Sequence, residues 1–184
     1  MRPALLIIDM INRFDFDGGP ALARHAATAS SSIQVVRATF HAHDWPVLFV
    51  NDNFMDWNSE FSDLVTSCRQ LPGAPGQIAS ALEPQPSDYY VLKPRHSAFL
   101  CTTLPAILAD LGAKSLVIVG VATDSCVLAS VQDAHMRGYT LHVPRDAVAA
   151  KSPERSRRAL ALMEDAMQID TRPAKTLVRS LLAT

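Results

Sequence analysis

The amino-acid sequence predicts an α/β fold in which helices cover both faces of an open, mostly parallel sheet. Short apolar runs alternate along the chain with segments of helical period, which is typical of strand–helix–strand crossover units. Several of these runs are apolar nearly throughout, as strands covered on both faces are. The length of 184 residues and the hydrophobic content of 48% predict a single domain, residues 1–184, with a sizeable core.

Five runs are predicted to be strands of this sheet. They are ALLIID at residues 4–9, PVLFVN at 46–51, YYVLK at 89–93, SLVIVGV at 115–121 and TLHVP at 140–144. The first, second and fourth carry almost no polar side chain before their last residue. This pattern favours parallel strands that are buried on both faces.

The segments between and after these strands carry apolar residues at helical spacing. Gly112 and Gly138 stand where two of the helices are expected to end, and Ser152 and Pro153 stand where another is expected to begin. The helical segments are marked by Ile33, Val36 and Phe40; by Leu104, Ile107, Leu108 and Leu111; by Val127, Leu128, Val131 and Ala134; by residues 152–167; and by Leu177, Val178, Leu181 and Leu182.

Residues 51–76 interrupt the alternation of strands and helices. This segment is long and mixed in character, and it closes on a cluster of proline and glycine at 72–76. Ordered excursions of this length are often lids or interfaces. The segment carries large apolar side chains, among them Phe54, Trp57, Phe61 and Leu64. They predict a homo-oligomer in which the segment forms part of a subunit interface or closes a neighbour's pocket.

Composition excludes several classes of partner and location. Lysine and arginine total 17 against 18 acidic residues, so no basic surface for nucleic acid or an anionic membrane is expected. No apolar segment approaches the roughly 20 residues needed to span a bilayer, and Asp9 interrupts the first run too early for a signal peptide. Three cysteines form no disulfide framework. We expect a cytoplasmic protein whose partner is a small molecule or another protein.

Three reactive side chains are predicted to meet at one edge of the sheet. Ligands of such sheets bind beyond the carboxyl ends of the strands, where Asp9, Lys93 and Cys126 are placed. At a helix start, Cys126 would lie near unpaired N–H groups that favour a thiolate and can hold an oxyanion, and the Lys93 ammonium would also favour the thiolate. Each residue alone also has a common structural explanation, as a buried thiol, a turn residue or a solvated lysine.

The motifs around these residues resemble those of the isochorismatase-like cysteine hydrolases. The matching stretches are LLIIDM with Asp9, LKPRHSAF with Lys93, and VIVGVATDSCVLASVQDAHMRGY with Cys126. The resemblance implies a three-layer α/β/α sandwich with a doubly wound sheet, usually oligomeric, which hydrolyses C–N bonds of small amide or ureido compounds. It implies that Cys126 is the nucleophile, that Asp9 accepts and donates protons, and that Lys93 holds the thiolate and orients Asp9.

The same resemblance implies an oxyanion hole, and the same edge of the sheet supplies candidate pocket walls. A cis peptide bond is expected between Val121 and Ala122, which would direct the N–H groups of Ala122 and Cys126 at the oxyanion. The expected substrate-binding residues lie on the same edge, although core or interface packing is an equally common role for each of them. They are Phe14, Asn53, Trp57, Ser97, Phe99 and Val121.

One departure from the family pattern concerns metal. Nicotinamidases of this superfamily carry an Asp-x-His arrangement after the second strand and further histidines that bind a metal ion. The corresponding stretch here, NDNFMDWNSEF, contains no histidine, so we expect no metal and no other cofactor.

Two alternatives to amide cleavage stay open. True isochorismatases cleave a vinyl ether, and the presence of Cys126 favours the amide-cleaving branch over them. A thiol with a lowered pKa is also found in redox-responsive binding proteins that are not enzymes. Release of ammonia from a panel of amides distinguishes these hypotheses.

Overall fold

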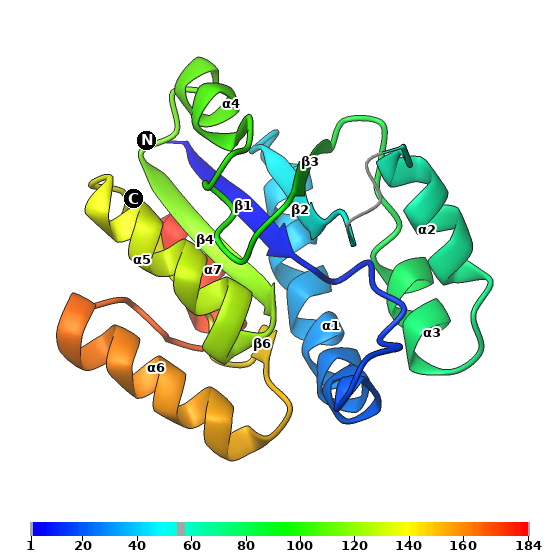
Figure 1. The fold of residues 1–184 in the computed structure, drawn as a ribbon. Helices are drawn as coiled ribbons and strands as arrows, with labels where there is room; N and C mark the ends of the chain where they lie inside the picture. Colours follow the sequence, from blue (N-terminus) through cyan, green and yellow to red (C-terminus); the bar gives the residue numbers. More distant parts are fainter. Residues whose placement is uncertain (1, 55–57, 184) are drawn as a thin grey trace.

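The computed structural model describes residues 2–54 and 58–183, and in these residues six parallel strands form one sheet between two layers of helices (Figure 1). The strand order is β3-β2-β1-β4-β5, and β6 pairs with the end of β4. The strands are β1 Pro3–Ile8, β2 Val47–Asp52, β3 Tyr89–Lys93, β4 Ser115–Val121, β5 Thr140–His142 and β6 Val148–Ala149. The predicted α/β sandwich with a parallel sheet is confirmed.

The helices divide between the two faces of the sheet. Residues of α1, α2, α3 and α7 share one apolar core with one face of the strands, and residues of α4, α5 and α6 share a second core with the other face. The helices are α1 Gly19–Ala42, α2 Phe61–Arg69, α3 Ala74–Ala81, α4 Leu104–Asp110, the π-helical turn η1 Thr123–Val127, α5 Leu128–Met136, α6 Pro153–Met167 and α7 Ala174–Leu182.

The alternation of side chains along β1 explains why its sequence is apolar throughout. Leu5 and Ile7 point into the core with α1, whereas Leu6 and Ile8 point into the core with α5. All four side chains are fully buried. A central parallel strand with helices on both sides has no face on which a polar residue is exposed to water.

The register of the strands aligns their carboxyl ends. Ile8 is level with Val50 on one side and with Gly120 on the other. In the pairing of β2 with β3, Asp52 is level with Lys93. The residues that follow β1 and β4 and those that end β2 and β3 therefore meet at one edge of the sheet.

Two parts of the chain differ from the sequence-based expectation. Residues 51–76 include α2 and the start of α3, and Phe61 is buried in the chain's own core rather than exposed for an interface. The expected strand at 140–144 ends at His142, and the chain returns to the sheet at β6, a strand of two residues. A strand this short has no periodicity that sequence analysis can detect.

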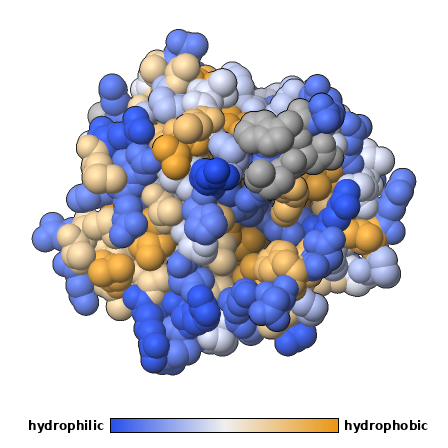
Figure 2. All heavy atoms as spheres, viewed as in Figure 1, coloured by the Kyte–Doolittle hydropathy of each residue, from blue (hydrophilic) through white to orange (hydrophobic). Residues whose placement is uncertain are grey.

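The surface is mixed in character. On the face displayed in Figure 2, hydrophilic and hydrophobic residues are interspersed. Within residues 2–54 and 58–183, no helix is both long and apolar enough to cross a membrane.

Candidate active site

The turn after β1 places Asp9 at the carboxyl edge of the sheet. Asp9 has a left-handed backbone conformation with φ of 52°, and its N–H donates to the carbonyl of Val50 at 3.0 Å. Its Oδ1 accepts a hydrogen bond of 2.7 Å from the N–H of Asp52. Asn51, fully buried, holds the same turn by donating to the carbonyl of Ile11 at 2.6 Å. These contacts fix the direction of the Asp9 carboxylate.

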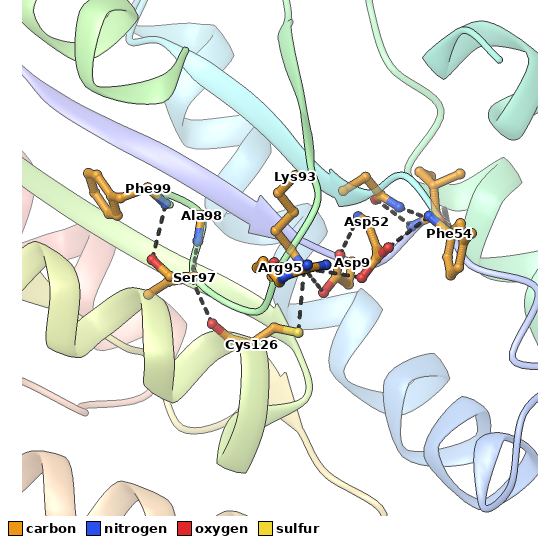
Figure 3. A network of polar contacts seen from close by, with 12 residues as sticks. Asp9, Asp52, Phe54, Lys93, Arg95, Ser97, Ala98, Phe99 and Cys126 are labelled. Atoms are coloured by element: carbon orange, nitrogen blue, oxygen red, sulfur yellow. Dashed lines mark hydrogen bonds and ion pairs between the residues drawn. The ribbon is translucent and has the colours of Figure 1, made fainter. Parts of the chain in front are cut away.

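Lys93 ends β3 and lies at the centre of the cluster of polar groups in Figure 3. Its side chain is fully buried, and its Nζ lies 2.9 Å from Oδ2 of Asp9. The same Nζ lies 3.5 Å from Sγ of Cys126 and donates to the carbonyl of Arg95 at 3.2 Å. A fourth neighbour is Oδ2 of Asp52, at 3.7 Å. The structure thus brings together the three residues that the sequence places at this edge.

Cys126 lies in η1, the turn that joins β4 to α5. The Val121–Ala122 peptide bond before this turn is cis. The carbonyl of Ala122 accepts hydrogen bonds from the N–H groups of Ser125, at 3.0 Å, and Val127, at 3.1 Å. The hydroxyl of Ser130, one turn further along α5, donates to the carbonyl of Cys126 at 2.6 Å.

The electrostatics of the three side chains differ from the expectation for Cys126. Burial, reinforced by the Asp9 carboxylate, raises the pKa of the Cys126 thiol from 9.0 to about 12. Lys93 lowers this pKa as expected, but desolvation of the thiolate by burial outweighs it, so the expectation of a lowered thiol pKa is wrong for the resting site. Burial also raises the pKa of Asp9. Burial lowers the pKa of Lys93, but Asp9 and Cys126 together raise it above its ordinary value.

A cavity of about 530 Å³ lies next to this cluster at Asp52, and none of Asp9, Lys93 and Cys126 lines it. Asp52 belongs to both, because it lines the cavity and lies beside Lys93. Asn53, one of the expected substrate-binding residues, also lines the cavity. Val121, another of them, is the buried last residue of β4, and Trp57 lies outside the described residues.

The other three expected substrate-binding residues are engaged elsewhere. Ser97 donates its hydroxyl to Asp133 of α5 at 2.7 Å. Phe99 is buried with the guanidinium of Arg137 over its ring, and Figure 3 shows both Ser97 and Phe99 apart from the Lys93 side chain. Phe14 is buried in the core that contains α1. These contacts give Ser97, Phe99 and Phe14 structural partners within the chain, and a substrate-binding role for them stays a prediction.

Sequence analysis missed two residues of the site. Asp52 and Asn51 end β2, just as Lys93 ends β3, so the argument from strand ends applies to them equally. In the described part of the chain, no group of three or more His, Cys, Asp or Glu side chains is arranged to hold a metal ion. The absence of a metal requirement stays a prediction.

Comparison with known proteins identifies the family. A family model for the isochorismatase domain matches residues 3–172. The chain belongs to the isochorismatase family. It is 34% identical over 164 residues to the uncharacterized isochorismatase family protein YaaI of Bacillus subtilis, covering 89% of this chain and 90% of that protein. A crystal structure of an isochorismatase family protein from Desulfovibrio vulgaris superposes with a TM-score of 0.80 and 28% identity, and each chain is covered completely.

A further relative of this isochorismatase-family chain carries an activity in its name. The ureidoacrylate amidohydrolase RutB of Methylobacterium radiotolerans is 30% identical over 161 residues, which are 79% of this chain and 62% of that protein. The family resemblance seen in the sequence motifs is confirmed, and the chain is an enzyme of the isochorismatase-like hydrolase type.

Proposed function

We propose that this enzyme hydrolyses a C–N bond of a small amide or ureido compound through a thioester on Cys126. The observation that carries the proposal is the position of the Lys93 ammonium, 2.9 Å from the Asp9 carboxylate and 3.5 Å from the Cys126 sulfur. An acid–base group, a cation and a nucleophile in mutual contact match the requirements of covalent acyl transfer. The name of the RutB relative supports the amide or ureido class of substrate.

The first half-reaction begins with a neutral thiol. As the Cys126 sulfur attacks the carbonyl carbon, the S–H proton passes to the Asp9 carboxylate, with which the thiol is hydrogen bonded. The C–S bond forms and the carbonyl electrons move to oxygen, where the N–H groups of Ala122 and Cys126 are the proposed donors. The tetrahedral intermediate then collapses, the C–N bond breaks, and Asp9 gives its proton to the departing nitrogen.

The second half-reaction uses the same carboxylate. Asp9, ionised again, takes a proton from a water molecule as its oxygen attacks the thioester carbon. The C–S bond breaks, the carboxylic product leaves, and the thiolate recovers a proton from Asp9. Burial raises the pKa of Asp9, which suits a group that must hold a proton between these steps.

The raised thiol pKa argues against the redox-responsive alternative. Oxidant-sensing cysteines are thiolates at neutral pH, whereas burial keeps Cys126 protonated. Cleavage of a vinyl ether does not require the thiol, so the contact between Cys126 and Lys93 favours amide cleavage over it as well.

The experiment is a substrate panel of primary amides, ureido acids and isochorismate, assayed for ammonia and for pyruvate. The proposal predicts ammonia from at least one amide or ureido compound and none in Cys126→Ser. Pyruvate from isochorismate with no ammonia from the rest of the panel would contradict it.

A further inference from the structure

Among the residues that the structure describes, Asp52 is the one carboxylate outside the expected triad that lies near the Lys93 ammonium. Its Oδ2 lies 3.7 Å from the Lys93 Nζ, across the pairing of β2 with β3. Its Oδ1 accepts a hydrogen bond of 2.7 Å from the N–H of Phe54, which closes an Asx-turn and fixes the side chain. One carboxylate oxygen therefore holds the turn while the other faces the ammonium, as seen in Figure 3.

The proposed reaction creates a need for this second carboxylate. Lys93 is fully buried, and in the resting site its charge is balanced by Asp9. Each time Asp9 takes a proton, from the thiol or from water, that balance is lost. A buried ammonium without a carboxylate partner carries a large desolvation cost, which favours loss of its proton.

We propose that Asp52 is a positioning residue whose carboxylate keeps the Lys93 ammonium charged and in place while Asp9 is protonated. The role of Asp52 in turnover rests on the proposed function. Its electrostatic part, the effect of Asp52 on Lys93, depends only on the geometry.

The charged and polar groups that surround Lys93 come from four parts of the chain. Asp9 follows β1, Asp52 ends β2 and Cys126 lies in η1, while the loop after β3 supplies the carbonyl of Arg95. Asp52 is one third exposed, at 33% of its side-chain area, and it faces the cavity. Other charged residues line that cavity: Arg13, Asp15, Glu60 and Asp63. Asp52 therefore remains in contact with solvent, whereas Asp9 is buried.

The substitution Asp52→Asn tests this inference with little change in shape. An asparagine oxygen still accepts from the N–H of Phe54, and the backbone N–H still donates to Asp9, so only the negative charge beside Lys93 is removed. Asp15→Asn is the matched control, because it removes a carboxylate from the same cavity without touching Lys93.

The direct readout is the titration of Lys93 itself. The chain contains four lysines, so NMR of protein labelled with ¹³C at lysine Cε resolves few signals, and Lys93→Met assigns the one that matters. We expect the titration midpoint of Lys93 to move to lower pH in Asp52→Asn and to stay in place in Asp15→Asn. An unchanged midpoint in Asp52→Asn, or an equal change in both variants, would overturn the inference.

Kinetics separate a positioning role from a substrate-binding role. On the best panel substrate, we expect kcat of Asp52→Asn to fall about tenfold at neutral pH and KM to change by less than about twofold. In the plot of kcat against pH, the fall in activity at alkaline pH should begin at a lower pH than in the parent enzyme. A raised KM with unchanged kcat would place Asp52 in substrate binding and refute the inference. If the parent enzyme releases ammonia from nothing in the panel, the proposed function fails, and the lysine titration still decides the effect of Asp52.

Discussion

The substitution Asp9→Asn removes the proposed proton carrier and leaves the shape of the site intact. Asparagine tolerates the left-handed backbone that Asp9 adopts at φ of 52°. Its side-chain oxygen must face the N–H of Asp52, which donates to Asp9 at 2.7 Å. The amide NH₂ then points at the Lys93 ammonium, so a donor meets a donor where the parent has an ion pair of 2.9 Å.

The expected losses follow from this geometry. Removing one partner of a buried ion pair costs about 3 to 5 kcal/mol, and the remaining contact of Lys93 with Asp52 favours the lower value of about 3 kcal/mol. For a domain of this size that corresponds to a fall in Tm of roughly 6 to 12 °C. Loss of a general acid–base group lowers turnover by about 10²- to 10⁴-fold.

The assay pairs thermal unfolding with ammonia release. The double variant Asp9→Asn/Lys93→Met is the control, because it removes both charges and should recover most of the lost stability while staying inactive. Turnover of folded Asp9→Asn within about threefold of the parent would refute the proton-carrier role. A double variant no more stable than Asp9→Asn would refute the ion-pair explanation of the stability loss.

Four further predictions concern stability, association and metal. Folding raises the pKa of Cys126, so its contribution to the free energy of unfolding is complete below pH 9.0 and is lost as pH rises towards about 12. In urea unfolding across this pH range, the free energy of unfolding should therefore fall less for Cys126→Ala than for the parent. Gly120→Ala should destabilise the fold by about 3 kcal/mol, because its Cβ would lie 2.1 Å from the carbonyl oxygen of Ile8. Gly138→Ala shares the strain of a positive φ but meets no atom within 4 Å, so it should cost less in the same thermal scan. Sedimentation at micromolar concentration should show a homo-oligomer, and a chelator should leave ammonia release unchanged; a monomer or a chelator-sensitive enzyme would contradict these two expectations.

The sheet could be predicted from the sequence because its central strands are buried on both faces. The predicted strand at 89–93 coincides with β3, and the one at 115–121 coincides with β4. The helices of residues 51–76 were not predicted, although Phe61, Leu64, Val65 and Cys68 of α2 stand at helical spacing and pack against the core. The rule that ligands bind beyond strand ends was sufficient to bring Asp9, Lys93 and Cys126 together.

The wall of the pocket and the state of the thiol could not be predicted in the same way. Ser97 and Phe99 come shortly after β3, as pocket residues of such a sheet do. Their contacts with Asp133 and Arg137 join residues far apart in the sequence, and residue spacing does not reveal such contacts. The raised pKa of Cys126 depends on burial, which the sequence does not reveal for a single residue. Asp52 was within reach of the strand-end rule and was overlooked.

The most direct test of a cysteine nucleophile compares two serine variants on the best panel substrate. Cys126 contacts Lys93, whereas Cys101 is exposed and lies outside the triad. Ammonia release should fall by at least about 10⁴-fold in folded Cys126→Ser, because a hydroxyl is far harder to ionise than a thiol, and it should be unchanged in Cys101→Ser. Near-parental release of ammonia by folded Cys126→Ser would contradict the proposal that catalysis proceeds through a thioester on Cys126.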